Sequence, residues 1–198
     1  DYEIEVELND DNQSITGFER ITYTNYSPDP LSYFWLQLDQ NMQNKESDTY
    51  SSETSQVDQN LTTRGVKSLI GHDFDLGFKI LELKDNSGNN LSYTINKTMM
   101  RVNLPRPVRK GEQFKFTVRW YYNINNRTEV GGRSGMEFFP EDGNYLYSIA
   151  QFFPRMAVYD DVNGWQNKQY LGRGEFALPF GDYRVKIKVP ADHIVAST

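Results

Sequence analysis

The chain has 198 residues, 37% of them hydrophobic and 14% aromatic, which is enough for one core and predicts a single domain over 1–198. Its 21 Lys and Arg against 27 Asp and Glu give a net charge of -6, so no broad positive field exists to attract nucleic acid. No apolar run approaches the ~20 residues of a transmembrane helix, and the lack of cysteine excludes disulfides and thiolate metal sites.

The N-terminal part of the sequence predicts strands separated by turns. Residues 2–8 alternate Tyr, Ile, Val and Leu with Glu, which is the period of two of a strand with one wet face. Turn residues at 9–12 lead into a second β-rich run at 15–26, so the two runs predict a hairpin. Ser-Pro-Asp-Pro at 27–30 breaks the ladder, and the dense apolar run at 31–38 predicts a strand buried on both faces.

The rest of the chain continues the same β pattern. A long polar loop is predicted at 40–64, where apolar residues are almost absent. Further β-rich runs bounded by turn residues follow at 66–70, 78–83, 91–95, 99–104, 113–122, 145–153 and 183–189. The run at 99–104 leads into Pro105-Arg106-Pro107, and the run at 113–122 has one apolar face. Because no helical period appears, we expect an all-β fold, a saddle-like or sandwich arrangement of mostly antiparallel curved sheets.

The two ends of the sequence suggest a piece of a longer protein. The chain stops at Thr198 just after a β-like stretch at 194–196, without a turn or polar tail, so we expect a cut inside a longer polypeptide. Asp1 carries neither an initiating Met nor a signal sequence, which predicts a leader already removed or a start further downstream.

One string of residues resembles a known family. Residues 149–165 read Ile-Ala-Gln-Phe-Phe-Pro-Arg-Met-Ala-Val-Tyr-Asp-Asp-Val-Asn-Gly-Trp, and they are similar to a segment of the aminopeptidase N family of zinc metallopeptidases. Further similar stretches lie at 2–17, 23–28, 174–176, 181–183 and 189–196. Because the matches reach both ends, the resemblance implies that the family's N-terminal β domain covers nearly the whole chain, in its bacterial branch.

This resemblance implies a domain that is not itself catalytic. In the family, the N-terminal domain is a saddle of β-sheets that packs on a separate thermolysin-like catalytic domain, whose H-E-x-x-H motif and downstream Glu bind zinc. The only histidines here, His72 and His193, are too far apart for the i and i+4 positions of that motif. We therefore expect no catalytic residue, no metal ligand and no cofactor in this chain, with zinc in the parent enzyme. The implied partners are the chain's own catalytic domain and a peptide substrate, and the implied location is exported: periplasmic, envelope-associated or extracellular.

Gln151 is the one candidate site residue. The family uses a Gln just before its Phe-Pro segment to line the pocket for the substrate's N-terminal residue, and Gln151 is the matching position. An amide can accept from a peptide ammonium or donate to a carbonyl without adding charge. The alternative is a Gln that only hydrogen-bonds a neighbouring loop. Gly135-Met136-Glu137 superficially resembles the family's G-x-M-E-N motif, but Phe138 replaces the Asn and the string precedes Gln151, so we interpret Glu137 as a solvated carboxylate.

Other constellations give weaker signals. The string at 72–75 offers possible metal ligands, and the one at 160–164 vaguely resembles a calcium loop without its late bidentate Glu, so turn residues explain both. Asp160, Asp161 and Glu175 are available for glycosidase chemistry, although nothing in the sequence sets two of them across a sugar. No G-x-S-x-G elbow is present. Six N-x-S/T sequons are interpreted as turns of an Asn-rich chain.

A second hypothesis belongs to another functional class. The tryptophans Trp35, Trp120 and Trp165, with 13 Tyr and 12 Phe, could form a stacking platform for sugars. The alternative function is therefore a free-standing β-sandwich adhesion or carbohydrate-binding module. Because large rings are favoured in strands, we interpret Trp35 and Trp120 as core residues, and Trp165 less clearly so.

Overall fold

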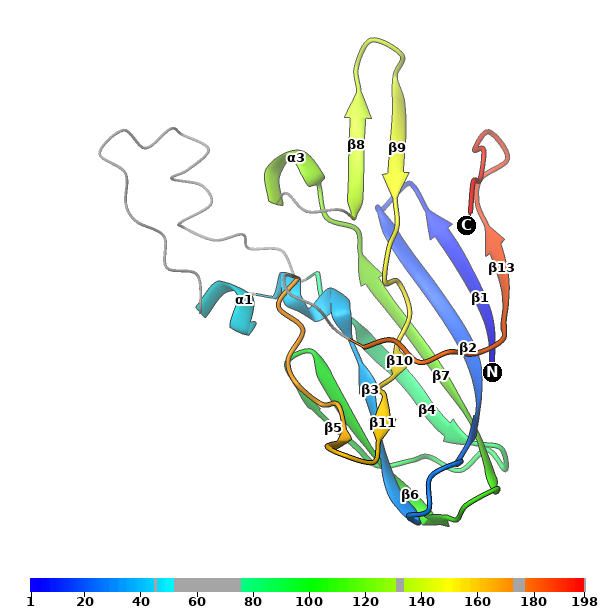
Figure 1. Ribbon diagram of the computed structural model, residues 1–198. Coiled ribbons are helices and arrows are strands. Elements are labelled where there is room, and N and C mark those ends of the chain that lie inside the picture. The colour runs from blue at the N-terminus through cyan, green and yellow to red at the C-terminus, as the bar shows by residue number, and fades with distance from the viewer. Residues whose placement is uncertain (45, 52–75, 131–133, 173–176, 198) are drawn as a thin grey trace.

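The computed structural model describes residues 1–44, 46–51, 76–130, 134–172 and 177–197, and it is an all-β fold, as expected (Figure 1). Its larger sheet has five strands in the order β13-β1-β2-β7-β4, and its smaller sheet has four in the order β10-β3-β6-β5. The larger sheet comprises β1 (Tyr2–Asn9), β2 (Ser14–Thr24), β4 (Lys79–Asp85), β7 (Gln113–Asn123) and β13 (Tyr183–Lys188). The smaller sheet comprises β3 (Leu31–Gln37), β5 (Tyr93–Asn96), β6 (Met99–Val108) and β10 (Arg155–Met156).

Two short hairpins and three single-turn helices complete the described structure. The hairpins are β8 (Gly135–Phe139) with β9 (Asn144–Ser148), which stands away from the sheets, and β11 (Tyr159–Asp160) with β12 (Gly164–Trp165). The helices are η1 (Asp39–Gln43), α1 (Asp48–Ser51) and α3 (Arg127–Val130). Every strand pair is antiparallel except β1 with β13, which run parallel.

The alternating sequences of β1, β2 and β7 place one face of the larger sheet in the core. On β1 the buried residues are Tyr2, Ile4 and Val6, while the intervening Glu residues are exposed. On β7, Phe116, Val118, Trp120 and Tyr122 are buried, and Phe114 is partly buried. This confirms the apolar faces predicted for 2–8 and 113–122.

An aromatic cluster joins the two sheets. Phe34 of β3 is fully buried, and its ring centroid lies 5.9 Å from those of Phe114 and Phe116 of β7. Trp165 packs 6.0 Å from Phe34 in the same cluster. Trp120 is also fully buried, and Trp35 packs partly buried against this core. The tryptophans therefore do not form one exposed platform.

Some predicted boundaries are wrong. The strand expected at 145–153 ends at Ser148, since the chain then turns and Gln151 adopts a left-handed φ of 52° that a ladder does not accommodate. β6 continues through Pro105 and Pro107 to Val108, because its pairing with β5 stops at Val102 and a missing N–H costs little at a free edge.

Other differences concern single segments. β3 has an exposed Ser32 and a partly buried Tyr33 and Trp35, so it is not buried on both faces. The stretch at 194–196 forms no strand; it follows a turn in which the His193 N–H donates to the Pro190 carbonyl. Within the loop predicted at 40–64, residues 40–43 belong to η1 and residues 48–51 to α1. Residues 45 and 52–64 lie outside the described residues, as does the strand expected at 66–70.

Candidate functional site

Gln151 lies in the segment that connects β9 with β10. Its side-chain Nε2 donates to Tyr170 Oη at 2.9 Å. The Tyr170 hydroxyl in turn can donate to Gln151 Oε1, which lies 3.2 Å away. Both amide atoms of the half-buried Gln151 are therefore within reach of one hydroxyl. The alternative to a role in substrate binding was a Gln that hydrogen-bonds a neighbouring loop, and the contact with Tyr170 is a bond of that kind. That Gln151 lines a substrate pocket stays a prediction.

The backbone around Gln151 and its partner Tyr170 are each held by further hydrogen bonds. Gln40 of η1 donates its Nε2 to the Ala150 carbonyl at 2.7 Å and reaches the Gln151 carbonyl at 3.3 Å. The partner hydroxyl is held as well, because the Tyr170 N–H donates to Thr98 Oγ1 at 2.8 Å. A non-glycine residue with positive φ is uncommon, and it persists only where surrounding contacts over-determine it.

The remainder of this segment is tied to the core. The Trp120 indole N–H donates to the Phe152 carbonyl at 3.0 Å, and the Met156 N–H donates to Tyr2 Oη at 3.0 Å. Residues 152–156 of the string that resembles the aminopeptidase N family are therefore bonded to the larger sheet, through Trp120 of β7 and Tyr2 of β1.

A buried ion pair lies at the end of that segment. Arg155 Nη2 is 2.7 Å from Asp39 Oδ2, and the two side chains are 8% and 2% exposed. Burial raises the pKa of Asp39 from 3.8 to about 6, and the Arg155 guanidinium opposes that rise. The pair joins η1, which also carries Gln40, to β10.

Glu19 is a buried carboxyl that our sequence interpretation missed. It is fully buried on β2, its Cα partners are Ile4 and Val118 on the flanking strands, and neither carboxyl oxygen has a hydrogen-bond partner among the described residues. Burial raises its pKa well above the ordinary 4.5. The signal was in the sequence, because the period of two puts Glu19 on the same face as Ile15 and Ile21.

The weaker candidates take structural roles or lie outside the described residues. Asp160 Oδ2 accepts from Gln166 Nε2, and its Oδ1 accepts from the N–H groups of Asn163 and Val162 in the β11–β12 turn. The bond from Gln166, followed by these backbone bonds, lowers the pKa of Asp160. Glu137 is partly buried on β8, while Glu175 and the string at 72–75 lie outside the described residues.

The residues that the structure describes do not fit a catalytic zinc ion. A zinc site needs three or four converging nitrogen, oxygen or sulfur ligands. Within the described ranges no group of three His, Cys, Asp or Glu side chains could hold a metal. His193 instead lies 2.9 Å from Asp192 Oδ1, with its ring 5.7 Å from that of Tyr147.

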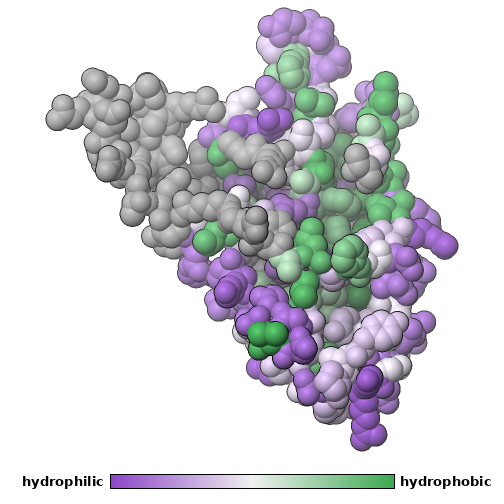
Figure 2. Space-filling model, in the orientation of Figure 1, coloured by the Kyte–Doolittle hydropathy of each residue, from purple (hydrophilic) through white to green (hydrophobic). Residues whose placement is uncertain are grey.

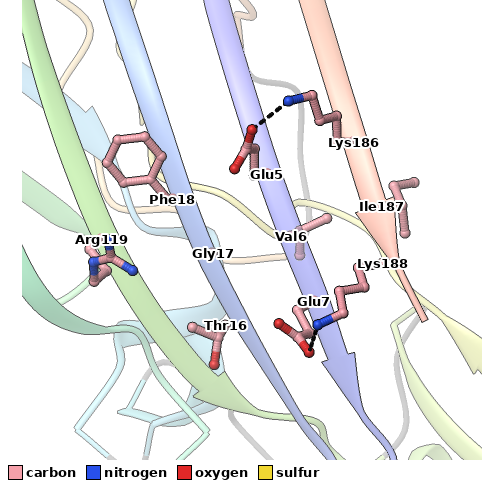
Figure 3. A pocket seen from close by; sticks show the side chains of 10 residues that line it. All are labelled: Glu5, Val6, Glu7, Thr16, Gly17, Phe18, Arg119, Lys186, Ile187 and Lys188. Carbon is pink, nitrogen blue, oxygen red and sulfur yellow. Dashed lines mark hydrogen bonds and ion pairs between the residues drawn. The ribbon is translucent and has the colours of Figure 1, made fainter. Parts of the chain in front are cut away.

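The outer face of the larger sheet is hollowed. A volume of about 400 Å³ is bounded by β1, β2, β7 and β13 (Figure 3). Lys186 and Lys188 reach from β13 to Glu5 and Glu7 on β1, with 2.7 Å between nitrogen and oxygen in each pair. Because these four charged groups are paired with one another, we assign no ligand to this hollow.

Two groups of exposed apolar side chains lie on strands at the margin of the molecule, one on the β8–β9 hairpin and one on β13. Phe138, Tyr145 and Leu146 are exposed on the β8–β9 hairpin. Tyr183, Val185 and Ile187 are exposed on β13, and Figure 2 shows hydrophobic residues along that side of the molecule. In the part of the chain that the structure describes, no helix is long and apolar enough to span a membrane.

Comparisons with known proteins give only a loose link. No protein-family profile matches the chain, and no curated protein matches it. Among solved structures, an M1 zinc metallopeptidase from Deinococcus radiodurans is 16% identical, over 63% of this chain and 20% of that chain, with a TM-score of 0.39. A two-domain M1 zinc metallopeptidase variant bound to L-tryptophan is also 16% identical, over 70% of this chain and 22% of that chain, with a TM-score of 0.39. The chain thus spans about a fifth of the length of these enzymes.

Proposed function

We propose that this chain is the single, non-catalytic N-terminal β domain of a zinc-dependent aminopeptidase, in which it packs on the catalytic domain and helps to line the substrate entrance through Gln151. The zinc ion belongs to the catalytic domain in this proposal, and the whole enzyme is an exported protein. The observation that carries the proposal is the positive φ of Gln151 combined with an amide held in place by Tyr170.

A held amide suits the recognition of a peptide's amino terminus. Gln151 Oε1 can accept from an α-ammonium group, and its Nε2 can donate to a carbonyl. Because Tyr170 and Gln40 already order this residue and its backbone, little side-chain freedom is lost when a substrate binds. The string at 149–165 supports the same assignment through its resemblance to the aminopeptidase N family.

The exposed apolar residues of the β8–β9 hairpin support the proposal that this domain contacts a catalytic domain. Its exposed Phe138, Tyr145 and Leu146 stand on an arm that projects from the sheets (Figure 1). Apolar side chains gathered on one projecting element are typical of a contact surface between domains or proteins.

The first test asks whether this chain is catalytic by itself. The isolated chain, supplied with zinc, is expected to hydrolyse no aminoacyl substrate, and the coding sequence past Thr198 is expected to contain H-E-x-x-H. Chelator-sensitive turnover by the isolated chain would overturn the non-catalytic assignment. A stop codon or further β modules in place of the motif would favour the free-standing adhesion or carbohydrate-binding module.

The second test concerns Gln151 in the full-length enzyme. Gln151→Ala is expected to lower kcat/KM for substrates with a free amino terminus by ~10- to 100-fold, about the value of one hydrogen bond to a charged group. Gln13→Ala is the matched control, because Gln13 also has a positive φ, of 55°, and its Oε1 accepts from Tyr147 Oη at 2.8 Å. Equal kinetic effects of the two substitutions would assign Gln151 a structural role only.

A further inference from the structure

We propose that the free edge of β13 binds a separate extended peptide that alternates apolar and acidic side chains, and adds it to the larger sheet as a further strand. This surface is distinct from Gln151, and the inference does not depend on the proposed function.

β13 is the edge strand of the larger sheet. Within the described residues it pairs only with β1, and all six of its residues are exposed. An edge strand presents unpaired backbone N–H and C=O groups, which an extended peptide can satisfy. β13 contains no proline, and its pairing with β1 is continuous, so it offers a regular template.

One face of this edge is apolar. Tyr183, Val185 and Ile187 lie level with the buried Tyr2, Ile4 and Val6, yet they are 47%, 41% and 42% exposed. The apolar row of the sheet therefore continues one strand beyond the part that is covered. A strand added at this edge would cover that row with its own apolar residues.

The other face of the edge is basic. Arg184, Lys186 and Lys188 lie level with Glu3, Glu5 and Glu7 of β1, and the two lysines bind Glu5 and Glu7. On its paired side, β13 thus already accepts a strand that alternates apolar and acidic residues. An ammonium group has three donors, so each lysine can also bond to a carboxylate from the free side.

Charge argues against a second copy of this chain as the occupant. Pairing β13 with its copy would put two basic rows on the same face of the joined sheet, and like charges across neighbouring strands are destabilising. An acidic row in the added strand converts that repulsion into attraction. The chemistry of the edge therefore selects a peptide that differs from β13 itself.

The test uses the 198-residue chain and blocked peptides of ~9 residues, the length of an ordinary strand. One peptide alternates Val and Glu, a second alternates Val and Lys, and a third is the Val-Glu peptide with alternate amides N-methylated. Titration calorimetry is expected to give binding of the first peptide at least about tenfold tighter than of the other two, weakening with added salt. Amide shifts in NMR spectra are expected at β13.

A pair of variants separates the charge contribution from general effects. The double change Lys186→Gln and Lys188→Gln is expected to weaken binding of the Val-Glu peptide by about tenfold. The control is Lys84→Gln on β4 at the opposite edge, where Lys84 pairs with Glu82 of its own strand at 2.9 Å, and binding is expected to stay unchanged. Equal binding of the Val-Glu and Val-Lys peptides, shifts confined to other strands, or self-association of the chain through β13 would each overturn the proposal.

Discussion

Asp39 and Arg155 form an ion pair with 2.7 Å between carboxylate and guanidinium, and almost none of either side chain is exposed. The two residues are 116 positions apart in the sequence, so the contact holds η1 against β10 and fixes the backbone that leads to Gln151.

Removing one partner of this pair leaves a buried charge. Arg155→Met is expected to lower the free energy of unfolding by ~3–5 kcal/mol, because the buried Asp39 carboxylate then lacks its countercharge. Urea denaturation measures the change. Replacing both residues, with Asp39→Leu and Arg155→Met, is expected to recover most of the loss, and a single substitution that costs under about 1 kcal/mol contradicts the assignment.

The stability of the protein is expected to depend on pH through Glu19. Its pKa in the folded state lies well above the ordinary 4.5, so over that interval the folded state binds more protons than the unfolded state. The free energy of unfolding therefore falls as pH rises above ~4.5, by up to ~1.4 kcal/mol per pH unit from this group. Asp39, with a folded pKa of about 6, adds a contribution of the same sign between ~4 and ~6.

Glu19→Gln is expected to remove the Glu19 contribution. The variant should match the parent near pH 4 and exceed it in stability at pH 7, since a neutral amide carries no charge into the core. Urea titrations at the two pH values measure the difference. Glu7→Gln, an exposed change on the neighbouring strand, is the control and should alter stability by under ~1 kcal/mol at both. A pH slope unchanged by Glu19→Gln would contradict the buried protonated form.

Gly17 makes room for Trp120. A Cβ on Gly17 would lie 2.2 Å from Cζ2 of the fully buried indole, so Gly17→Ala is expected to cost ~1–3 kcal/mol of stability or more. Thermal unfolding and tryptophan fluorescence measure the change. Gly181→Ala is the control, because its Cβ meets its nearest atoms at 3.7 Å, an ordinary contact. Equal melting temperatures for the two variants would mean that the sheet relaxes around the added methyl group.

Asn25 connects the end of β2 to the end of β6. Its fully buried side chain donates to the carbonyls of Asp29 and Val108 at 2.7 and 2.9 Å and accepts from the Ser27 N–H at 2.9 Å. Asn25→Asp is expected to destabilise by ~1–3 kcal/mol, because a carboxylate cannot donate to the two carbonyls. The change is measured by chemical denaturation. Asn90→Asp, at an exposed position that forms an isolated β-bridge with Lys84, is the control, and equal losses at both positions would contradict this role.

The sequence predicted local structure where apolar and polar residues alternate over several positions of a strand. The alternation at 2–8 and 113–122 identified β1 and β7 and their buried faces. An alternation of the same kind on β2 places Glu19 on the buried face, but we did not predict it from the sequence. The resemblance at 149–165 pointed to Gln151, but no local pattern predicted its positive φ or its bond to Tyr170.

The sequence by itself determined that the chain forms β-strands and which side chains face inward, because a period of two is a property of neighbouring residues. Only the tertiary structure decided how the strands beyond the β1–β2 hairpin pair, that β13 lies parallel to β1 at the edge of the described sheet, and that Asp39 meets Arg155. The pairing of β1 with β13 and of Asp39 with Arg155 joins residues more than 100 positions apart, and the energies of such contacts arise only when the two sheets close on one core.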